Sequence, residues 1–344
     1  MLTFRLRIFR AALDGATGES DRQRKMSNTG HTNEDGYQEA QNRINLAMSD
    51  PTAYAEMLKQ ESKTWSTRLP GRSTDEDQQE DQNAGFELGI NRELARLTHV
   101  LARNGIAPER GLSLGCGEGR AERRLLKQRI CKSWHGIDLA EEAIADARKL
   151  ADKQNIPITY AVQDLNFVQL PRGEFDLVIA QTCLHHVLRL EHVIDEIASS
   201  LAPNGVLWAT DFIGETQLQF TDLRIRIVNE LIDLLPEKHV TSALTGRTIG
   251  KLMRRRPETF LAPFESIRSG EIKKVLLSRF DVIEQHETAS LINYVVPGGT
   301  RVSYLENADT RALFELLMYF DKLLIELGVL SPTSGQYLLL PKVS

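Results

Sequence analysis

Short apolar runs alternate with amphipathic helical patterns from Gly111 to Asp211, and this alternation restricts the fold more than any other feature of the chain. Strands that alternate with helices require right-handed crossover connections, so they form a parallel sheet that carries helices on both faces. Ligands of such sheets bind at the carboxyl ends of the strands. We predict strands at Gly111–Leu114, Ser133–Asp138, Ile158–Val162, Phe175–Ala180 and Gly205–Asp211, and helices at Ala121–Arg129, Glu141–Gln154 and about Leu190–Leu201.

The segments on either side of this alternation extend the same domain. Apolar residues from Phe86 to Leu101 recur at helical spacing, and Gly105 follows as a stop signal. After Asp211 the patterns predict a helix, a strand, a second helix and a final strand that we expect to run antiparallel: Gln217–Leu235, Phe280–Glu287, Leu305–Leu327 and Gln336–Leu340. The predicted class is therefore α/β, with a doubly wound, mostly parallel seven-stranded sheet and a helical insertion at about 215–263.

Residues 1–83 are predicted to be an N-terminal extension ahead of the domain at 84–344. Asp14 to Arg43 are mostly small, polar or charged, a composition that buries too little apolar surface to offset the entropy lost on ordering. We therefore expect the extension to be largely disordered. A short helix near 50–67 is the exception, because Pro51 stands at a first helical position that tolerates proline.

Composition excludes several classes of protein. The 344 residues include 42 Lys and Arg against 47 Asp and Glu, so no positive field would attract nucleic acid. The sequence has no run of about 18 apolar residues, so it predicts no membrane span. The three cysteines, Cys116, Cys131 and Cys183, form no Cys-x-x-Cys pair and no metal-like group with histidine. We expect a reducing, cytoplasmic setting and no metal site.

A glycine-rich loop follows the first predicted strand, in the sequence Leu114-Gly115-Cys116-Gly117-Glu118-Gly119-Arg120. Glycines between a strand and a helix allow a sharp turn and let a ligand lie against the main chain. A dinucleotide fingerprint needs a third glycine where Arg120 stands, so the loop disfavours an NAD-dependent oxidoreductase.

Two acids stand at the ends of the next two strands. Asp138 follows Gly119 by 19 residues and could accept hydrogen bonds from both hydroxyls of a ribose. Asp164 could accept from the exocyclic amine of an adenine, and Leu139 and Leu165 could enclose the ring. A glycine loop with two acids at successive strand ends predicts an adenosine-containing cofactor.

With these motifs the sequence resembles the class I S-adenosylmethionine-dependent methyltransferases, over about Phe86 to Gly214. The likeness is specific at the glycine loop, at Gly136-Ile137-Asp138, at Asp164 and at Phe175 to Val178 leading to Gln181. It implies a Rossmann-like methyltransferase fold with S-adenosylmethionine as the cofactor. The implied cofactor-binding residues are Gly115, Cys116, Gly117, Glu118, Gly119, Asp138, Leu139, Asp164, Leu165 and Gln181. Ser113 departs from the family, which usually has an acid there.

Candidates for the chemistry follow the fourth and fifth predicted strands. Methyl transfer mainly requires an aligned attack, and a base is needed only when the nucleophile must lose a proton. His185 and His186 either shape the cofactor pocket or supply that base, and Asp211 is a further candidate. Cys183 is expected to be a small buried residue.

The acceptor is predicted only by class. The segments after Asp211 and around Pro263 to Ile272 resemble those bordering the acceptor pocket in bacterial methyltransferases often encoded with glycan-synthesis enzymes. The resemblance implies methyl transfer to a small molecule or glycan, at oxygen in preference to carbon or nitrogen. The alternative is a protein that binds S-adenosylmethionine as a sensor or scaffold without turnover. The sequence leaves the oligomeric state open.

Overall fold

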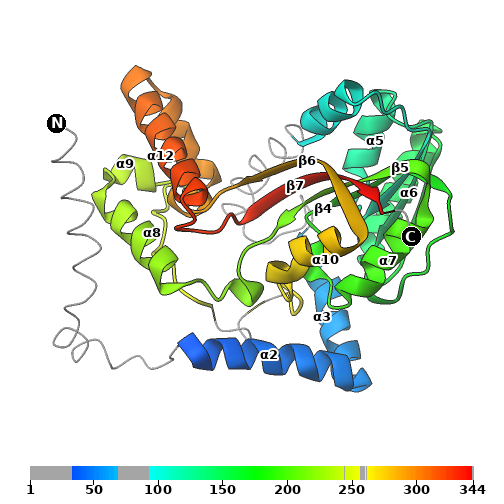
Figure 1. Cartoon of the computed structure of the whole chain (residues 1–344), viewed down its shortest axis with the longest axis horizontal. Coiled ribbons are helices and arrows are strands. Elements are labelled where there is room, and N and C mark those ends of the chain that lie inside the picture. The colour runs from blue at the N-terminus through cyan, green and yellow to red at the C-terminus, as the bar shows by residue number, and fades with distance from the viewer. Residues whose placement is uncertain (1–32, 69–92, 244, 256–259, 261, 343–344) are drawn as a thin grey trace.

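The computed structural model describes residues 33–68, 93–243, 245–255, 260 and 262–342, and within them seven strands form one sheet in the order β3-β2-β1-β4-β5-β7-β6 (Figure 1). The first five strands pair in parallel, and β7 lies antiparallel between β5 and β6. The predicted seven-stranded, mostly parallel sheet is confirmed. Its strands are β1 Arg110–Leu114, β2 Ser133–Asp138, β3 Ile158–Val162, β4 Phe175–Gln181, β5 Leu201–Phe212, β6 Phe280–Thr288 and β7 Ser334–Pro341.

Helices connect and cover these strands. The α-helices are α2 Asn33–Ser49, α3 Pro51–Arg68, α5 Arg120–Lys127, α6 Glu141–Gln154, α7 Leu190–Ser200, α8 Asp222–Leu234, α9 Glu237–Val240, α10 Ile272–Arg279, α11 Ile292–Val295 and α12 Ala308–Glu326. Short 3-10 turns are η3 Leu165–Phe167, η4 Leu184–His186, η5 Thr216–Leu218, η7 Ser269–Glu271 and η8 Gly298–Leu305. Residues 93–103 are also helical, whereas 86–92 of the predicted helix lie outside the described residues. None of the described helices combines the length and apolar character that crossing a membrane requires.

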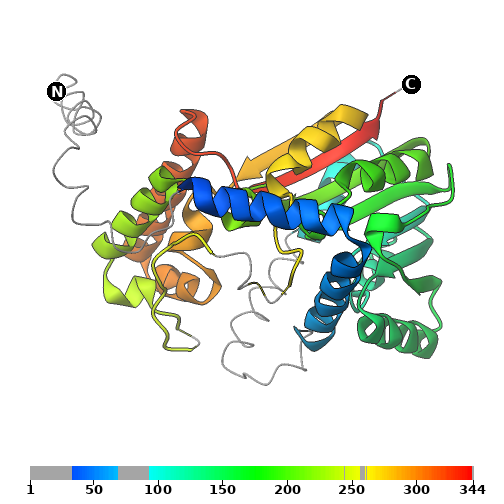
Figure 2. The ribbon, with the colours of Figure 1, turned by 90° about the horizontal axis from the view of Figure 1, so that it is seen from below.

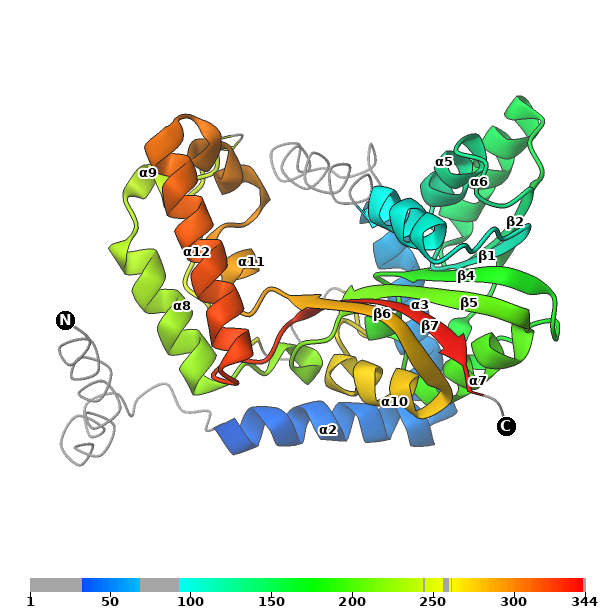
Figure 3. The same cartoon turned by 45° about the horizontal axis from the view of Figure 1, so that its top comes forward.

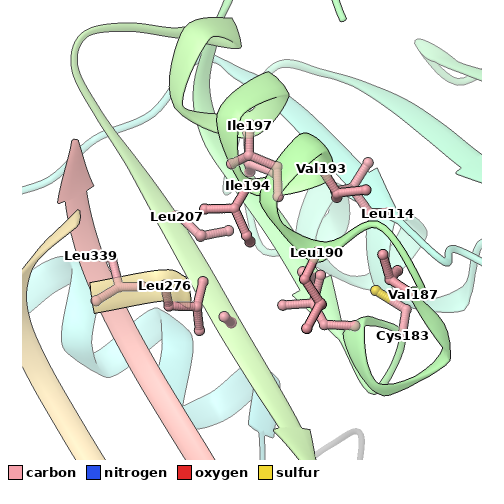
Figure 4. Close-up of a cluster of buried hydrophobic side chains, with 14 of the residues drawn as sticks. Leu114, Cys183, Val187, Leu190, Val193, Ile194, Ile197, Leu207, Leu276 and Leu339 are labelled. Carbon is pink, nitrogen blue, oxygen red and sulfur yellow. The ribbon is translucent and has the colours of Figure 1, made fainter. Parts of the chain in front are cut away.

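Both faces of the sheet are buried, because successive side chains of a strand point to opposite faces. Leu112 and Leu114 pack with α7 and α10 in one cluster, and Figure 4 shows side chains of α7 directed at Leu207 of β5. Leu177 and Trp208 pack on the other face with α6 and the helix at 93–103. The continuous apolar strands in the sequence reflect this double burial.

A separate apolar cluster holds the helices beyond β5 and β6 together. Val228 of α8, Leu291, Val295 of α11 and Leu324 of α12 are buried against one another. Figure 3 shows this helical cover at the far end of β6 and β7 from α5 and α6. The chain enters the cover between β5 and β6 and again between β6 and β7, so the cover consists of two insertions, whereas the sequence predicted one at about 215–263.

The helix predicted at Gln217–Leu235 begins later than expected. Gln217 has a left-handed φ of 50°, and the helix α8 starts only after Thr221, whose side chain accepts from the Arg224 amide. Gln217 is buried, and its Nε2 donates to the Ala40 carbonyl at 2.9 Å. A tertiary contact therefore replaces the first predicted helical turn.

The expected disorder of residues 33–43 is wrong, because α2 covers them; residues 14–32 lie outside the described residues. The helix expected near 50–67 is α3. Ala40 is buried near the middle of α2, and Ile44 packs in a cluster with Leu188, Phe264 and Ile267. These partners are far away in sequence, so local composition could not reveal the burial that offsets the ordering entropy. Figure 2 shows α2 running along the molecule and α3 turning from its end.

Candidate cofactor and acceptor site

The backbone of the glycine loop between β1 and α5 adopts conformations that are unfavourable for residues with a side chain. Gly115, Gly117 and Gly119 have φ of 64°, 53° and 70°, all in the left-handed region that favours glycine. A Cβ on Gly115 would lie 2.4 Å from the Cβ of Cys183, so this glycine allows the loop to pack against the end of β4. A Cβ on Gly117 would meet nothing within 4 Å, so this glycine faces open space.

Asp138 ends β2 beside this loop. Its Oδ2 accepts from the Gly117 amide at 2.7 Å, and its Oδ1 accepts from the Ala140 amide at 2.8 Å. Burial raises the pKa of Asp138, and these backbone amides partly counter that effect. The glycine loop and the acid after β2, which the sequence linked only by spacing, are in direct contact.

Asp164 follows β3 and binds a residue that the sequence did not assign to the site. Its Oδ1 accepts from the Asn166 amide at 2.9 Å, and its Oδ2 accepts from the Tyr54 phenol at 2.5 Å. Burial, together with this bond to Asp164, raises the pKa of Tyr54. Leu165 begins η3 directly after the acid. The N-terminal extension thus reaches the predicted adenine-binding position.

One cavity of about 1040 Å³ joins the predicted residues. Leu58, Glu61 and Trp65 of α3 line one side. The helical cover lines another with Ser242, Thr245, Arg247, Thr248, Ile249 and residues 297–300. The Leu139 carbonyl, also beside the cavity, accepts from Ser62 at 3.2 Å. The predicted residues in its wall are Gly115, Cys116, Gly117, Glu118, Asp138, Leu139, Asp164, Leu165, Gln181, His185 and His186. Gly119 and Asp211 are not among the residues that line this cavity.

The histidine pair stands in η4, after β4. The Nδ1 of His185 lies 2.5 Å from Oδ1 of Asp211, whose Oδ2 accepts from the Leu184 amide at 2.7 Å. Burial favours the neutral imidazole, but the charge and hydrogen bond of Asp211 outweigh it, so the pKa of His185 is raised. All three predicted catalytic candidates therefore belong to one cluster, with Asp211 orienting His185.

His186 is bordered by a further residue of α3. Its Nδ1 lies 2.9 Å from Oε1 of Glu61, and burial would raise the pKa of Glu61, but His186 and the Phe264 amide lower it. Sequence reasoning missed Tyr54 and Glu61, because the polar segment around α3 carries no motif. The apolar positions Tyr54, Met57, Leu58 and Trp65, which follow helical spacing, were the available signal.

Glu122 is a third residue that the sequence analysis missed. It is fully buried on α5 and lines the cavity, and within the described structure its carboxylate makes no hydrogen bond of ordinary geometry. Burial raises its pKa to about 7, and the Ser113 hydroxyl partly opposes this shift. Ser113 stands where the resemblance calls for an acid, so the structure supplies a carboxyl group beside that position from α5.

Cys183 matches its expected role. It is buried against the glycine loop, and burial raises its pKa well above the ordinary thiol value. A thiol with a raised pKa holds little thiolate and is a poor nucleophile.

Residues 112–209 match the methyltransferase domain family. This part of the chain is a class I methyltransferase domain. Its cofactor is S-adenosylmethionine, and the residues present fit that molecule: Gly117 leaves open the space that a Cβ would occupy, and Asp138 lies beside it at the cavity wall. The matched segment contains the glycine loop and both strand-end acids. It ends before the helical cover.

Curated relatives match mainly this segment. The "Arginine-hydroxylase NDUFAF5, mitochondrial" of Rattus norvegicus is 32% identical over 105 residues, which are 30% of this chain and 29% of that protein. The "Ubiquinone biosynthesis O-methyltransferase" of Coxiella burnetii (strain RSA 493 / Nine Mile phase I) is 26% identical over 113 residues, 33% of this chain and 47% of that protein. The chain thus spans less than half the length of either relative.

A solved structure, the S-adenosylmethionine dependent methyltransferase from Mesorhizobium loti, is 20% identical, with 68% of this chain and 90% of that chain covered and a TM-score of 0.40. The fold is defined by the strand order of this chain, with β7 antiparallel between β5 and β6, and does not depend on the comparison with that structure.

Proposed function

We propose that the protein transfers a methyl group from S-adenosylmethionine to an oxygen atom of a small-molecule or glycan acceptor. One observation carries the proposal: a single cavity contains both the glycine loop with Asp138 and the histidine cluster of η4. A cofactor on the loop and an acceptor beside His185 would therefore share one space. Methyl transfer needs this alignment of donor and nucleophile more than any covalent help from the protein.

The cofactor, when bound, supplies an electrophilic methyl group on a sulfonium, and the chain supplies its orientation. Asp138 is assigned to the ribose hydroxyls, and Asp164 to the adenine amine. The glycine loop would contact the amino-acid part of the cofactor, and Leu139 and Leu165 would enclose the adenine. The remaining residues assigned to the cofactor are Gly115, Cys116, Gly117, Glu118, Gly119 and Gln181.

A hydroxyl acceptor must lose its proton as it is methylated, whereas a thioether sulfur or a neutral amine can attack the methyl group directly with its lone pair. His185 supports this assignment, because Asp211 holds its Nδ1 and leaves Nε2 as the exchanging atom. Asp211 would act as a positioning residue, fixing the tautomer and orientation of the ring.

The cavity itself favours a small acceptor. Away from the glycine loop and Asp138, the cavity is lined by α3 and by polar residues of the helical cover, among them Ser242, Thr248 and Thr300. Hydroxyl and backbone groups of this kind bind neutral polar ligands such as sugars and phenols with directed hydrogen bonds. Arg247 also lines the cavity, and its positive charge would favour an acceptor that carries an acidic group.

Domain limits and location belong to the same proposal. We assign the catalytic domain to 84–344, with the helical cover as its acceptor-binding part and α3 of the N-terminal extension as an added wall. A cytoplasmic location stays a prediction from the unpaired cysteines. The name of the rat relative places that protein in mitochondria.

The test uses the full chain with S-adenosylmethionine labelled in its methyl group and with metabolite and glycan fractions as acceptors. We expect S-adenosylhomocysteine to form and the label to enter a small hydroxylated product. Asp138→Ala should weaken calorimetric binding of S-adenosylhomocysteine at least tenfold, whereas exposed Asp152→Ala should not. Equal affinity in the Asp138→Ala variant would overturn the cofactor assignment. Binding without transfer to any fraction would favour the sensor or scaffold alternative.

A further inference from the structure

Three side chains, two of which line the cavity, hold potential metal-binding atoms close to one another. They are His185 and His186 of η4 and Glu265 of the loop between the helical cover and η7, and we call them the triad. The Nε2 of His185 lies 3.8 Å from Oε1 of Glu265, and the Nε2 of His186 lies 3.9 Å from Oε2. One ligand atom from each residue lies within 4.8 Å of the other two.

Each imidazole of the triad has a carboxylate on its opposite side. Asp211 lies 2.5 Å from Nδ1 of His185, and Glu61 lies 2.9 Å from Nδ1 of His186. Both rings therefore turn Nε2 toward Glu265. Histidines that bind metals usually have a carboxylate hydrogen-bonded to the other ring nitrogen, which fixes the tautomer and makes the ligand more basic. Asp211 makes this bond to His185, whereas Glu61 supplies a nearby negative charge to His186.

The loop that carries Glu265 is held in place by the same two elements. The Phe264 amide donates to Oε2 of Glu61 at 2.8 Å, and the Ile267 amide donates to the His185 carbonyl at 3.0 Å. Between them Ser266 is fully buried with a left-handed φ of 50°, an unfavourable conformation for a residue with a side chain. Ser266 also donates to Oε1 of Glu265 at 3.1 Å. The carboxylate of Glu265 is thus fixed by a strained, anchored loop.

Hydrogen bonds within the described structure leave the ring nitrogens of His186 without partners. Nε2 of His186 is buried without a hydrogen-bond partner in the described structure, and Nδ1 is out of line with Glu61 for a hydrogen bond. Buried ring nitrogens are normally paired, so an unpaired one indicates a missing partner. In addition, the carboxylates of Glu61, Asp211 and Glu265 bring three negative charges to the two rings. A cation between the rings and Glu265 would supply both the missing partner and the balancing charge.

We propose that His185, His186 and Glu265 bind one divalent transition-metal ion such as Zn²⁺, Co²⁺ or Fe²⁺. Two imidazoles and one carboxylate suit these ions, whereas Mg²⁺ and Ca²⁺ prefer oxygen ligands. Bonds of about 2.1 Å would place neighbouring ligand atoms about 3.0–3.4 Å apart. The observed separations of 3.8 and 3.9 Å need only small side-chain rotations to reach that range.

The ion would have coordination positions left for a ligand in the cavity, since His185 and His186 both line it. An acceptor hydroxyl bound there would lose its proton to solvent water in the cavity more readily, because the metal lowers the pKa of a coordinated oxygen. His185 would then serve as a metal ligand in place of a base. This use rests on the proposed function, but the binding of the ion does not.

The experiment measures metal binding by the tag-free, full-length protein without cofactor or acceptor. A negative result would therefore overturn the metal site without bearing on the proposed methyl transfer. The protein is first treated with a chelator and then titrated with Co²⁺, whose visible absorption reports its ligands. We expect one equivalent to bind, with a d–d spectrum of nitrogen and oxygen ligands, and Zn²⁺ to displace it. His185→Ala and Glu265→Gln should each weaken binding at least tenfold, and Asp211→Asn about 10–100-fold.

His99→Ala is the matched control, because His99 is an exposed histidine on the helix at 93–103. It should leave the affinity for Co²⁺ unchanged. Circular dichroism and the urea midpoint of the metal-free Glu265→Gln variant check that it folds. Binding that persists in the His185→Ala and Glu265→Gln double variant, or a thiolate charge-transfer band implicating Cys116 or Cys183, would overturn the proposal. So would the absence of any bound Co²⁺ and Zn²⁺ at millimolar concentration.

Discussion

The phenol of Tyr54 donates to Oδ2 of Asp164 at 2.5 Å across 110 residues of sequence. This bond attaches α3 to the position after β3 that is assigned to adenine. The Tyr54 ring also stacks on Phe264, with centroids 5.6 Å apart. The N-terminal extension is therefore part of the cavity wall.

Tyr54→Phe should lower the free energy of unfolding by about 1.5–3 kcal/mol, because it removes a partly buried hydrogen bond to a charged group while preserving the ring contacts. Urea unfolding followed by circular dichroism measures the change. Tyr319→Phe is the matched control, since Tyr319 is 63% exposed on α12. Equal midpoints for both variants would show that Tyr54 contributes only through its ring.

Gly117→Ala should separate folding from cofactor binding. Gly117 and Gly173 have φ of 53° and 61°, and a Cβ at either would meet nothing within 4 Å. Both alanine variants should therefore lose a similar stability of about 1 kcal/mol from backbone strain. Only Gly117→Ala should weaken S-adenosylhomocysteine binding, by at least tenfold in calorimetry, because its methyl group would occupy the cofactor's space. A similar affinity in both variants would place the cofactor elsewhere.

Glu122 should make stability depend on pH. Its pKa rises on folding from 4.5 to about 7, so the folded state favours the protonated carboxyl. The resulting stabilisation is fully present below pH 4.5 and is lost as the pH rises through 7, to a limit of about 3 kcal/mol. Glu122→Gln should match the wild type near pH 5 and exceed its melting temperature at pH 8.

Glu230→Gln is the control for this titration, because Glu230 is exposed on α8. Its melting temperature should follow that of the wild type at every pH. The interpretation fails if the difference between Glu122→Gln and the wild type is the same at pH 5 and pH 8.

Arg224 should be necessary for the attachment of the helical cover. It is 1% exposed, its Nε donates to Glu215 at 2.8 Å, and its other nitrogens donate to the carbonyls of Ser290 and Ser331. Arg224→Met leaves the carboxylate and two carbonyls without this partner, and we expect a loss of about 3–5 kcal/mol.

Exposed Arg226→Met, two residues further along α8, should change the stability by less than about 0.5 kcal/mol. Unfolding in guanidinium chloride measures the stability of both variants. Equal midpoints would mean that the apolar contacts of the cover hold it without Arg224.

The strands and the glycine loop could be predicted because their signals are local. A buried strand needs a short continuous apolar run, and the left-handed turns at Gly115 and Gly117 need residues without a Cβ. The antiparallel β7 was also predicted, although its place between β5 and β6 was not.

The order of α2 depends on Ile44 and Ala47, which are buried in a cluster with Phe264 and Ile267 far along the chain. A polar composition describes only the cost of ordering such a segment. The compensating contacts exist only after the chain has folded, so the sequence predicted disorder where the structure has a helix.

The sequence alone determined the parallel sheet, the glycine loop and the acids Asp138 and Asp164, because periodicity and backbone conformation are encoded within a few neighbouring residues. Only the tertiary structure decided that Tyr54 meets Asp164 and that Glu265 faces His185 and His186. These contacts join residues separated by about 80 to 110 positions, and no local pattern encodes which distant segment will supply the partner of a buried polar group.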